Sequence, residues 1–163
     1  MNIDKLITLF GKEYKNKELA GFFQQDEFDL IQDVKNYMQT DSYEGTESSV
    51  YASNYKNGYE LHFADELDYL DVDGQYGESG NYYFTVCGFY AQNVEGYNQY
   101  NGELLNGIKI TDTQETVRHK MGNNYRRHDF LDVDIWNNVN GCQVFVDYKE
   151  KTTPQIISIS LEK

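Results

Sequence analysis

The stretch with the clearest chemical potential is DELDYLDVDGQYGE, residues 65–78, which carries six acidic side chains and no basic one. The acids are Asp65, Glu66, Asp68, Asp71, Asp73 and Glu78. Like charges at this density repel one another and cost stability unless something compensates them. The compensation can come from a metal ion, from a role in catalysis, from a positively charged partner, or from water alone.

A calcium site is the first alternative, because Asp71 and Asp73 have DxDG spacing. An EF-hand loop needs acids at positions 1, 3 and 5, glycine at position 6 and glutamate at position 12. If Gly74 takes position 6, Tyr69 falls at position 1 and supplies no carboxylate. The sequence therefore predicts an acidic surface loop without a bound metal.

Catalysis is the second alternative, in the form of a small hydrolase that uses two carboxylates as acid and base. Such a pair needs a cleft that raises the pKa of one carboxyl group, whereas these acids crowd a polar loop. The rest of the chain has no Ser/His/Asp or Cys/His signature and no phosphate-binding loop. We therefore expect a protein that is not an enzyme and uses no cofactor.

Charge narrows the choice of partner. The formal net charge of −13 opposes binding to nucleic acid or to an anionic membrane, both of which need clustered cations. A basic stretch holds Arg118, His119, Lys120, Arg126, Arg127 and His128. We expect it to balance local acids or to lie at the C-terminus of a helix, where cations are favoured. A basic protein remains compatible with the charge, because opposite charges steer association.

Tyrosines accompany the acids and offer apolar contact area. Five of them lie in or beside loops rich in Gly, Asn and Gln: Tyr69, Tyr76, Tyr82, Tyr97 and Tyr100. Tyrosine packs well at interfaces for a small loss of entropy, although half-buried positions in a sheet explain the same pattern. Trp136 lies among apolar strand residues and is expected in the core. His62 is on the polar side of its strand and is expected to be exposed.

Short helices and strands must position these residues. In the first part of the chain, apolar periodicity predicts helices at 3–10 and about 16–25, while 28–38 fits either a helix or a strand. Three strands follow, at residues 48–55, 58–63 and 81–91, the first two joined by the turn Lys56-Asn57-Gly58.

The second part of the chain restarts with a short extended piece at 106–110. A helix then begins at Thr111 or Asp112, with Glu115 as in a capping box, and ends at Gly122. Three strands complete the chain, at residues 132–139, 142–149 and 155–162, with a hairpin turn at Asn140-Gly141.

The order of elements is similar in the two parts: a helix ending in Gly, a strand pair turning at Asn-Gly, and a closing strand. This predicts an α+β fold with one domain, residues 1–163, and internal repeats at 1–92 and 104–163. The repeats would form one continuous antiparallel sheet with helices on one face.

Cellular context follows from the remaining features. Cys87 and Cys142 lie in apolar strands, where buried free thiols are expected. The sequence alone leaves open whether the two cysteines form a disulfide bond. MNIDKLITLF does not have the pattern of a signal peptide, and no apolar run is long enough to span a membrane. A cytoplasmic protein is the expectation.

Three motifs carry a family resemblance: LFGK at 9–12, YNGELLNGI at 100–108, and a helix with Asp112-Thr113, Val117 and terminal Gly122. The helix-and-meander unit resembles the repeat of β-lactamase-inhibitor-protein-like folds, which also occurs in a small lipoprotein of the outer-membrane barrel-assembly machinery. The whole arrangement looks more like a group of bacterial immunity proteins. These proteins act by binding other proteins, so the resemblance implies a binder.

The resulting hypothesis is an immunity protein that occludes the active site of a cognate, basic bacterial toxin. A nuclease is one toxin class that fits, because an acidic inhibitor would imitate the charge of its substrate. The expected partner-binding residues are Asp65, Glu66, Asp68, Tyr69, Asp71, Asp73, Tyr76, Glu78 and Tyr82. The alternatives are an assembly module of the same fold and the small hydrolase.

Overall fold

The computed structural model describes residues 1–40, 47–77, 79–128 and 130–162. The helices in these ranges are α1 (Ile3–Ile7), α2 (Lys17–Gln24), α3 (Leu30–Tyr37), α4 (Glu66–Leu70), the 3-10 helix η1 (Leu105–Gly107) and α5 (Gln114–Met121). The strands are β1 (Ser49–Asn54), β2 (Tyr59–Asp65), β3 (Tyr82–Tyr90), β4 (Arg126–Arg127), β5 (Val133–Val139), β6 (Cys142–Asp147) and β7 (Ile156–Leu161).

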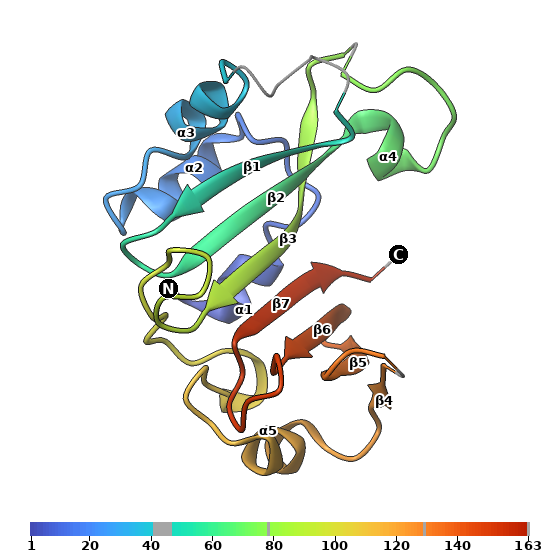
Figure 1. Ribbon diagram of the computed structural model, residues 1–163. Helices are drawn as coiled ribbons and strands as arrows, with labels where there is room; N and C mark the ends of the chain where they lie inside the picture. The colour runs from blue at the N-terminus through green and yellow to red at the C-terminus, as the bar shows by residue number, and fades with distance from the viewer. Residues whose placement is uncertain (41–46, 78, 129, 163) are drawn as a thin grey trace.

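All seven strands form one antiparallel sheet in the order β1-β2-β3-β7-β6-β5-β4 (Figure 1). Its centre is the pairing of β3 with β7, in register from Val86↔Ser160 to Tyr90↔Ile156. This pair joins the strands of the first half of the chain to those of the second half. The predicted α+β class and the single continuous sheet are confirmed, while the internal duplication stays a prediction.

The beginning of β3 is covered by the chain segment that follows α1. The Phe84 amide donates to the Lys12 carbonyl at 2.9 Å, and the Tyr14 amide donates to the Tyr82 carbonyl at 3.0 Å. Glu13 and Tyr83 form a β-bridge between these bonds. The segment therefore satisfies backbone groups of β3 that β7 does not reach.

One face of the sheet carries the core. Side chains in β2 alternate between core and opposite face, with Tyr59, Leu61 and Phe63 fully buried. A single apolar cluster joins this face to α1, α2, α3 and α5, so these helices cover the same side, as predicted. Helix α4 contributes no buried residue and lies at the end of the sheet (Figure 1). Trp136 is 2% exposed and belongs to the core, as expected.

The structure decides one open alternative and corrects two local predictions. Residues 28–38 contain a helix, α3, because the Asp29 carboxylate accepts from the Gln32 amide at 3.1 Å and caps its start. The prediction of an extended piece at 106–110 is wrong, because the chain forms the 3-10 helix η1 there. Asn106 and Gly107 have φ values of 55° and 72°, and left-handed backbone cannot continue a strand. Helix α5 begins after Thr113, whose hydroxyl accepts from the Thr116 amide at 3.2 Å.

Cys87 and Cys142 are both buried free thiols, as expected from their apolar strands. Among the described residues, none of the helices has the length and apolar character needed to cross a bilayer.

Candidate interaction surface

The first acid of the stretch, Asp65, is a structural residue. It is the last residue of β2 and the N-cap of α4, and it is 1% exposed. One carboxylate oxygen accepts from the Leu67 amide at 3.0 Å, and the other accepts from the Gly77 amide at 3.0 Å. The carboxylate therefore starts α4 and closes the loop that follows it, which leaves it unavailable to a partner.

Replacing Asp65 by alanine should lower the free energy of unfolding by about 2 kcal/mol, the upper end of the range for helix caps. Both carboxylate oxygens lose a backbone donor, and the loop 71–77 loses its closing contact. Urea unfolding measures the loss, and limited proteolysis should cut within 66–77. Asp73→Ala is the matched control, because Asp73 is exposed. Equal stability of the two variants would contradict the capping role.

Glu66 and Tyr69 hold α4 against the sheet. The Glu66 carboxylate accepts from Asn81 Nδ2 at 3.3 Å and from the Tyr83 hydroxyl at 3.4 Å. The Tyr69 ring stacks on Tyr83 with 4.7 Å between ring centroids. A side chain at Gly11 would place its Cβ 2.5 Å from the Tyr69 hydroxyl. These contacts hold α4 against the sheet within the protein itself.

Tyr82 is fully buried in the core, so its expected role as a partner contact does not fit its position. The reason is the strand period: Tyr82 and Phe84 point to the core face, whereas Tyr83 points to the opposite face. Glu78 lies outside the described residues.

The remaining residues of the stretch form an exposed patch, the α4 surface. Its apolar members are Leu70, Val72 and Tyr76, which are 57%, 48% and 38% exposed. Its acids are Asp71 and Asp73, which are exposed, and Asp68, which is half-buried. A shallow pocket of about 150 Å³ lies in this surface and is lined by Leu67, Asp68, Asp71, Val72, Asp73 and Tyr76. Sequence reasoning missed Leu70 and Val72, although their alternation with Asp71 and Asp73 was visible.

Two charges of the α4 surface, those of Asp71 and Asp73, are not neutralised by any residue that the structure describes. Within the described part of the chain, the side chains of Asp71 and Asp73 have no hydrogen bond and no ion pair. Asp71 ends α4 in the left-handed conformation, with φ of 57°, which turns the following residues away from the helix axis. Both carboxylates therefore rely on water for solvation in the free protein.

The basic stretch is largely neutralised, as predicted. Arg118 makes two hydrogen bonds to the Asp134 carboxylate, at 2.8 and 3.0 Å. Arg127 contacts the same carboxylate at 3.1 Å and also pairs with Asp132. Lys120 contacts Asp112 at 2.8 Å. These three cations are paired with acids of the second half of the fold, whereas Arg126 is exposed.

A buried polar network on the face opposite the core was not predicted. Glu60 accepts from Ser53 Oγ at 2.8 Å and from the hydroxyls of Tyr90 and Tyr97 at 3.2 and 2.6 Å. His62 Nε2 lies 2.8 Å from the same carboxylate. His62 is thus half-buried, which corrects the expectation that it is exposed.

The Glu60 network is built to hold a negative charge. Burial alone would raise the pKa of Glu60, but the hydrogen bonds from His62, Tyr97 and Ser53 lower it to about 2. The hydrogen bond to Glu60 adds to burial in raising the pKa of Tyr97. The carboxylate therefore stays ionised at neutral pH and cannot serve as a general acid there. It fixes the loop that carries Tyr97 onto the sheet.

The geometry does not favour the metal and hydrolase alternatives. Across the described ranges, no three His, Cys, Asp or Glu side chains are grouped so that they could hold a metal ion. Asp71 and Asp73 are exposed beside a shallow pocket, which gives neither carboxyl the shielding that acid–base work needs. Burial raises the pKa of Asp33, but its Oδ2 accepts from the Ser53 amide at 2.8 Å and ties α3 to β1.

Comparison of the chain with protein-family models, curated proteins and solved structures gives no match. The resemblance to immunity proteins therefore has no support from a relative and stays an expectation based on the motifs in this sequence.

Proposed function

We propose that this protein is an immunity-type inhibitor, which binds a basic cognate toxin through the α4 surface and occludes the toxin's active site. The observation that carries the proposal is the exposure of Leu70, Val72 and Tyr76 beside Asp71 and Asp73, two exposed carboxylates that no other described side chain pairs with. The action is steric, so no bond is made or broken by the inhibitor. A nuclease is a fitting target class, because its phosphate-binding cations would complement these acids.

The α4 surface combines two features of protein interfaces. Exposed apolar side chains supply anchors that become desolvated in a complex, and surrounding charges set specificity and the rate of encounter. Three residues support this surface without contacting the partner, because they hold α4 in place. Asp65 does so through Gly77, Glu66 through Asn81, and Tyr69 through Tyr83. The contact residues of the proposal are Asp68, Leu70, Asp71, Val72, Asp73 and Tyr76.

Neutralising Asp71 and Asp73 together should reduce the association rate with the purified toxin about tenfold at low salt, because electrostatic steering is lost. The dependence of that rate on salt should weaken at the same time. The toxin is first identified by capture from the native host at low salt and release at high salt, followed by mass spectrometry. Surface plasmon resonance with the purified toxin then gives both rates.

The matched control is Glu115→Gln with Glu162→Gln, which changes the net charge by the same amount at exposed positions elsewhere. A second variant, Leu70→Ser with Val72→Ser, should raise the dissociation rate and leave the salt dependence unchanged. If the two charge variants affect association equally, the α4 surface is not the interface. If the purified toxin stays active when fully bound, the protein is an interaction module and not an inhibitor.

A further inference from the structure

Three tyrosine rings are stacked where the loop between β3 and η1 meets the turn between β1 and β2 (Figure 1). Tyr90 is the last residue of β3, Tyr97 is in the loop, and Tyr55 follows the last residue of β1. The Tyr90 and Tyr97 rings have 4.0 Å between centroids and an interplanar angle of 13°. The Tyr97 and Tyr55 rings are stacked at 4.4 Å and 23°. We refer to the three rings as the tyrosine ladder.

The two inner rings of the tyrosine ladder are fixed to the sheet. Tyr90 and Tyr97 are buried, and their hydroxyls donate to the Glu60 carboxylate at 3.2 and 2.6 Å. The Tyr90 ring also lies close to the backbone of its own strand, since a Cβ at Gly88 would be 3.3 Å from Tyr90 Cε2. The inner rings therefore form a rigid base for the outer one.

The outer ring of the ladder, Tyr55, keeps one face open. Tyr97 covers one face of this ring, yet Tyr55 is 54% exposed. Gly96 lies at the edge of the ring, where a Cβ would be 4.0 Å from Tyr55 Cε1. Because the stacking covers a single face, the exposed surface belongs to the opposite face and to the edge of the ring. The ladder therefore ends in an accessible aromatic face.

Backbone contacts hold Tyr55 in this position. The Asn98 amide donates to the Tyr55 carbonyl at 2.9 Å, and Asn98 Nδ2 donates to the Lys56 carbonyl at 3.2 Å. Gly58 has φ of 74°, and a Cβ there would lie 2.3 Å from the Asn98 carbonyl oxygen. The turn between β1 and β2 can therefore approach the loop this closely only with glycine at this position. The ring is preorganised, which lowers the entropic cost of binding.

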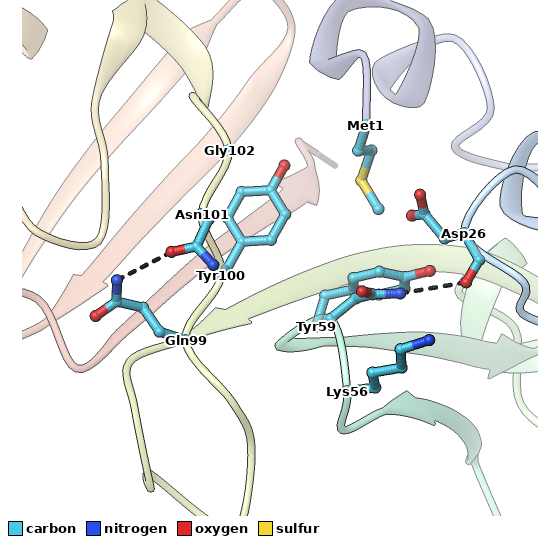
Figure 2. Close-up of a pocket in the computed structure, with 9 residues that line it drawn as sticks. Met1, Asp26, Lys56, Tyr59, Gln99, Tyr100, Asn101 and Gly102 are labelled. Atoms are coloured by element: carbon cyan, nitrogen blue, oxygen red, sulfur yellow. Dashed lines mark hydrogen bonds between the residues drawn. The ribbon is translucent and has the colours of Figure 1, made fainter.

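The open face of Tyr55 is not occupied by a cation of the protein itself. The neighbouring Lys56 lines a small pocket together with Asp26 (Figure 2), and its Nζ lies 3.2 Å from Glu27 Oε2. In the part of the chain that the structure describes, no lysine or arginine lies over the Tyr55 ring. The face is therefore available to a group from outside.

Charge selects the kind of group that fits this face. The face of an aromatic ring is electronegative and attracts cations. The ionised Glu60 carboxylate accepts from both inner hydroxyls and so places a negative charge behind the stacked rings. The net charge of −13 also favours a positively charged group. Among cations, the planar guanidinium of arginine stacks on aromatic faces and is more weakly hydrated than the lysine ammonium.

We propose that the open face of Tyr55 binds the guanidinium group of an arginine side chain that a protein partner presents. The guanidinium would continue the tyrosine ladder as its fourth planar group. The contact needs both planarity and positive charge, which distinguishes arginine from lysine and from uncharged planar groups. The proposal does not rest on the proposed function, because Tyr55 precedes β2, whereas α4 follows it at the opposite end.

The test is an NMR titration of the full chain with Nα-acetylarginine amide at low salt. The comparators are Nα-acetyllysine amide, Nα-acetylcitrulline amide, which is planar and uncharged, and the neutral sugar methyl β-D-glucoside. The arginine derivative should shift the Tyr55 ring protons and the amides of Gly96 and Asn98 in a saturable manner. The three comparators should bind at this position more weakly than the arginine derivative.

Variants assign the binding to the ring. Tyr55→Leu should weaken it about two- to fivefold, the range for a cation–π contact at an exposed site, whereas Tyr55→Phe keeps the ring and should bind like the parent. Tyr76→Leu is the matched control, because Tyr76 is also an exposed tyrosine and lies in the α4 surface. Neutralising Asp71 and Asp73 should likewise leave the Tyr55 shifts unchanged, so this result is separate from the test of the proposed function.

Four results would overturn the proposal. The first is the absence of a saturable shift at Tyr55 with the arginine derivative. The second is that the citrulline derivative or the glucoside binds there as tightly, which would show that charge is not recognised. The third is tighter binding of the lysine derivative, and the fourth is an unchanged affinity of Tyr55→Leu.

Discussion

Replacing Asp134 by alanine should lower the free energy of unfolding by about 3–5 kcal/mol, the cost of breaking a buried ion pair from one side. The Asp134 side chain is fully buried and accepts three hydrogen bonds from Arg118 and Arg127. Alanine would leave both guanidinium groups without this carboxylate. The expected decrease in Tm is about 10 °C for a chain of this size.

The location of Asp134 explains why the loss should be this large. Asp134 is on β5, Arg118 is on α5 and Arg127 is on β4. The carboxylate therefore links a helix and the edge strand to the sheet. Arg118 also lies over the Tyr125 ring, 4.8 Å from its centroid, so its position depends on the same cluster. Loss of the carboxylate should loosen α5 and β4 together.

Urea and thermal unfolding measure the effect of Asp134→Ala. The control is Glu27→Gln, which removes an ion pair with Lys56 in which both side chains are highly exposed. That change should cost less than about 1 kcal/mol. Similar losses for the two variants would show that Asp134 does not act as a buried partner for the arginines. Hydrogen exchange in α5 should also be faster in Asp134→Ala than in the control.

The sequence was a good guide where local pattern decides structure. Tyr59, Leu61 and Phe63 alternate with polar residues, and this period places them on the core face of β2. The turn at Asn140-Gly141 was also predictable, because both residues have positive φ, at 54° and 79°, as a two-residue hairpin needs.

The sequence was a poor guide where distant residues decide structure. Helix α4 was missed, because its cap depends on a carboxylate that also accepts from Gly77, twelve positions along the chain. For the same reason, the sequence could not distinguish the acids that accept hydrogen bonds within the fold, Asp65 and Glu66, from Asp71 and Asp73, which do not. The Glu60 network assembles Ser53, His62, Tyr90 and Tyr97 from three strands and a loop, and no local pattern marks it.

Replacing Glu60 by glutamine should lower the free energy of unfolding at pH 7 by about 3 kcal/mol, the equivalent of the pKa difference between the folded and unfolded states. The folded pKa is about 2, against an ordinary value of 4.5. Glutamine keeps one accepting oxygen but replaces the other with an NH2 group, which only donates, so one pair of donors around the carboxylate loses its acceptor. The loop that carries Tyr97 should therefore detach more readily from the sheet.

The pH dependence distinguishes the charge of Glu60 from its shape. A lowered folded-state pKa contributes stability that is fully present above the unfolded value of 4.5 and is lost as pH falls toward the folded value of about 2. The stability difference between the parent and Glu60→Gln should therefore shrink as pH falls through this window. Glu115→Gln, at an exposed helical position, should leave the profile of the parent unchanged. A difference between the parent and Glu60→Gln that stays constant from pH 7 to the acid limit would show that packing, and not the ionised carboxylate, holds the network together.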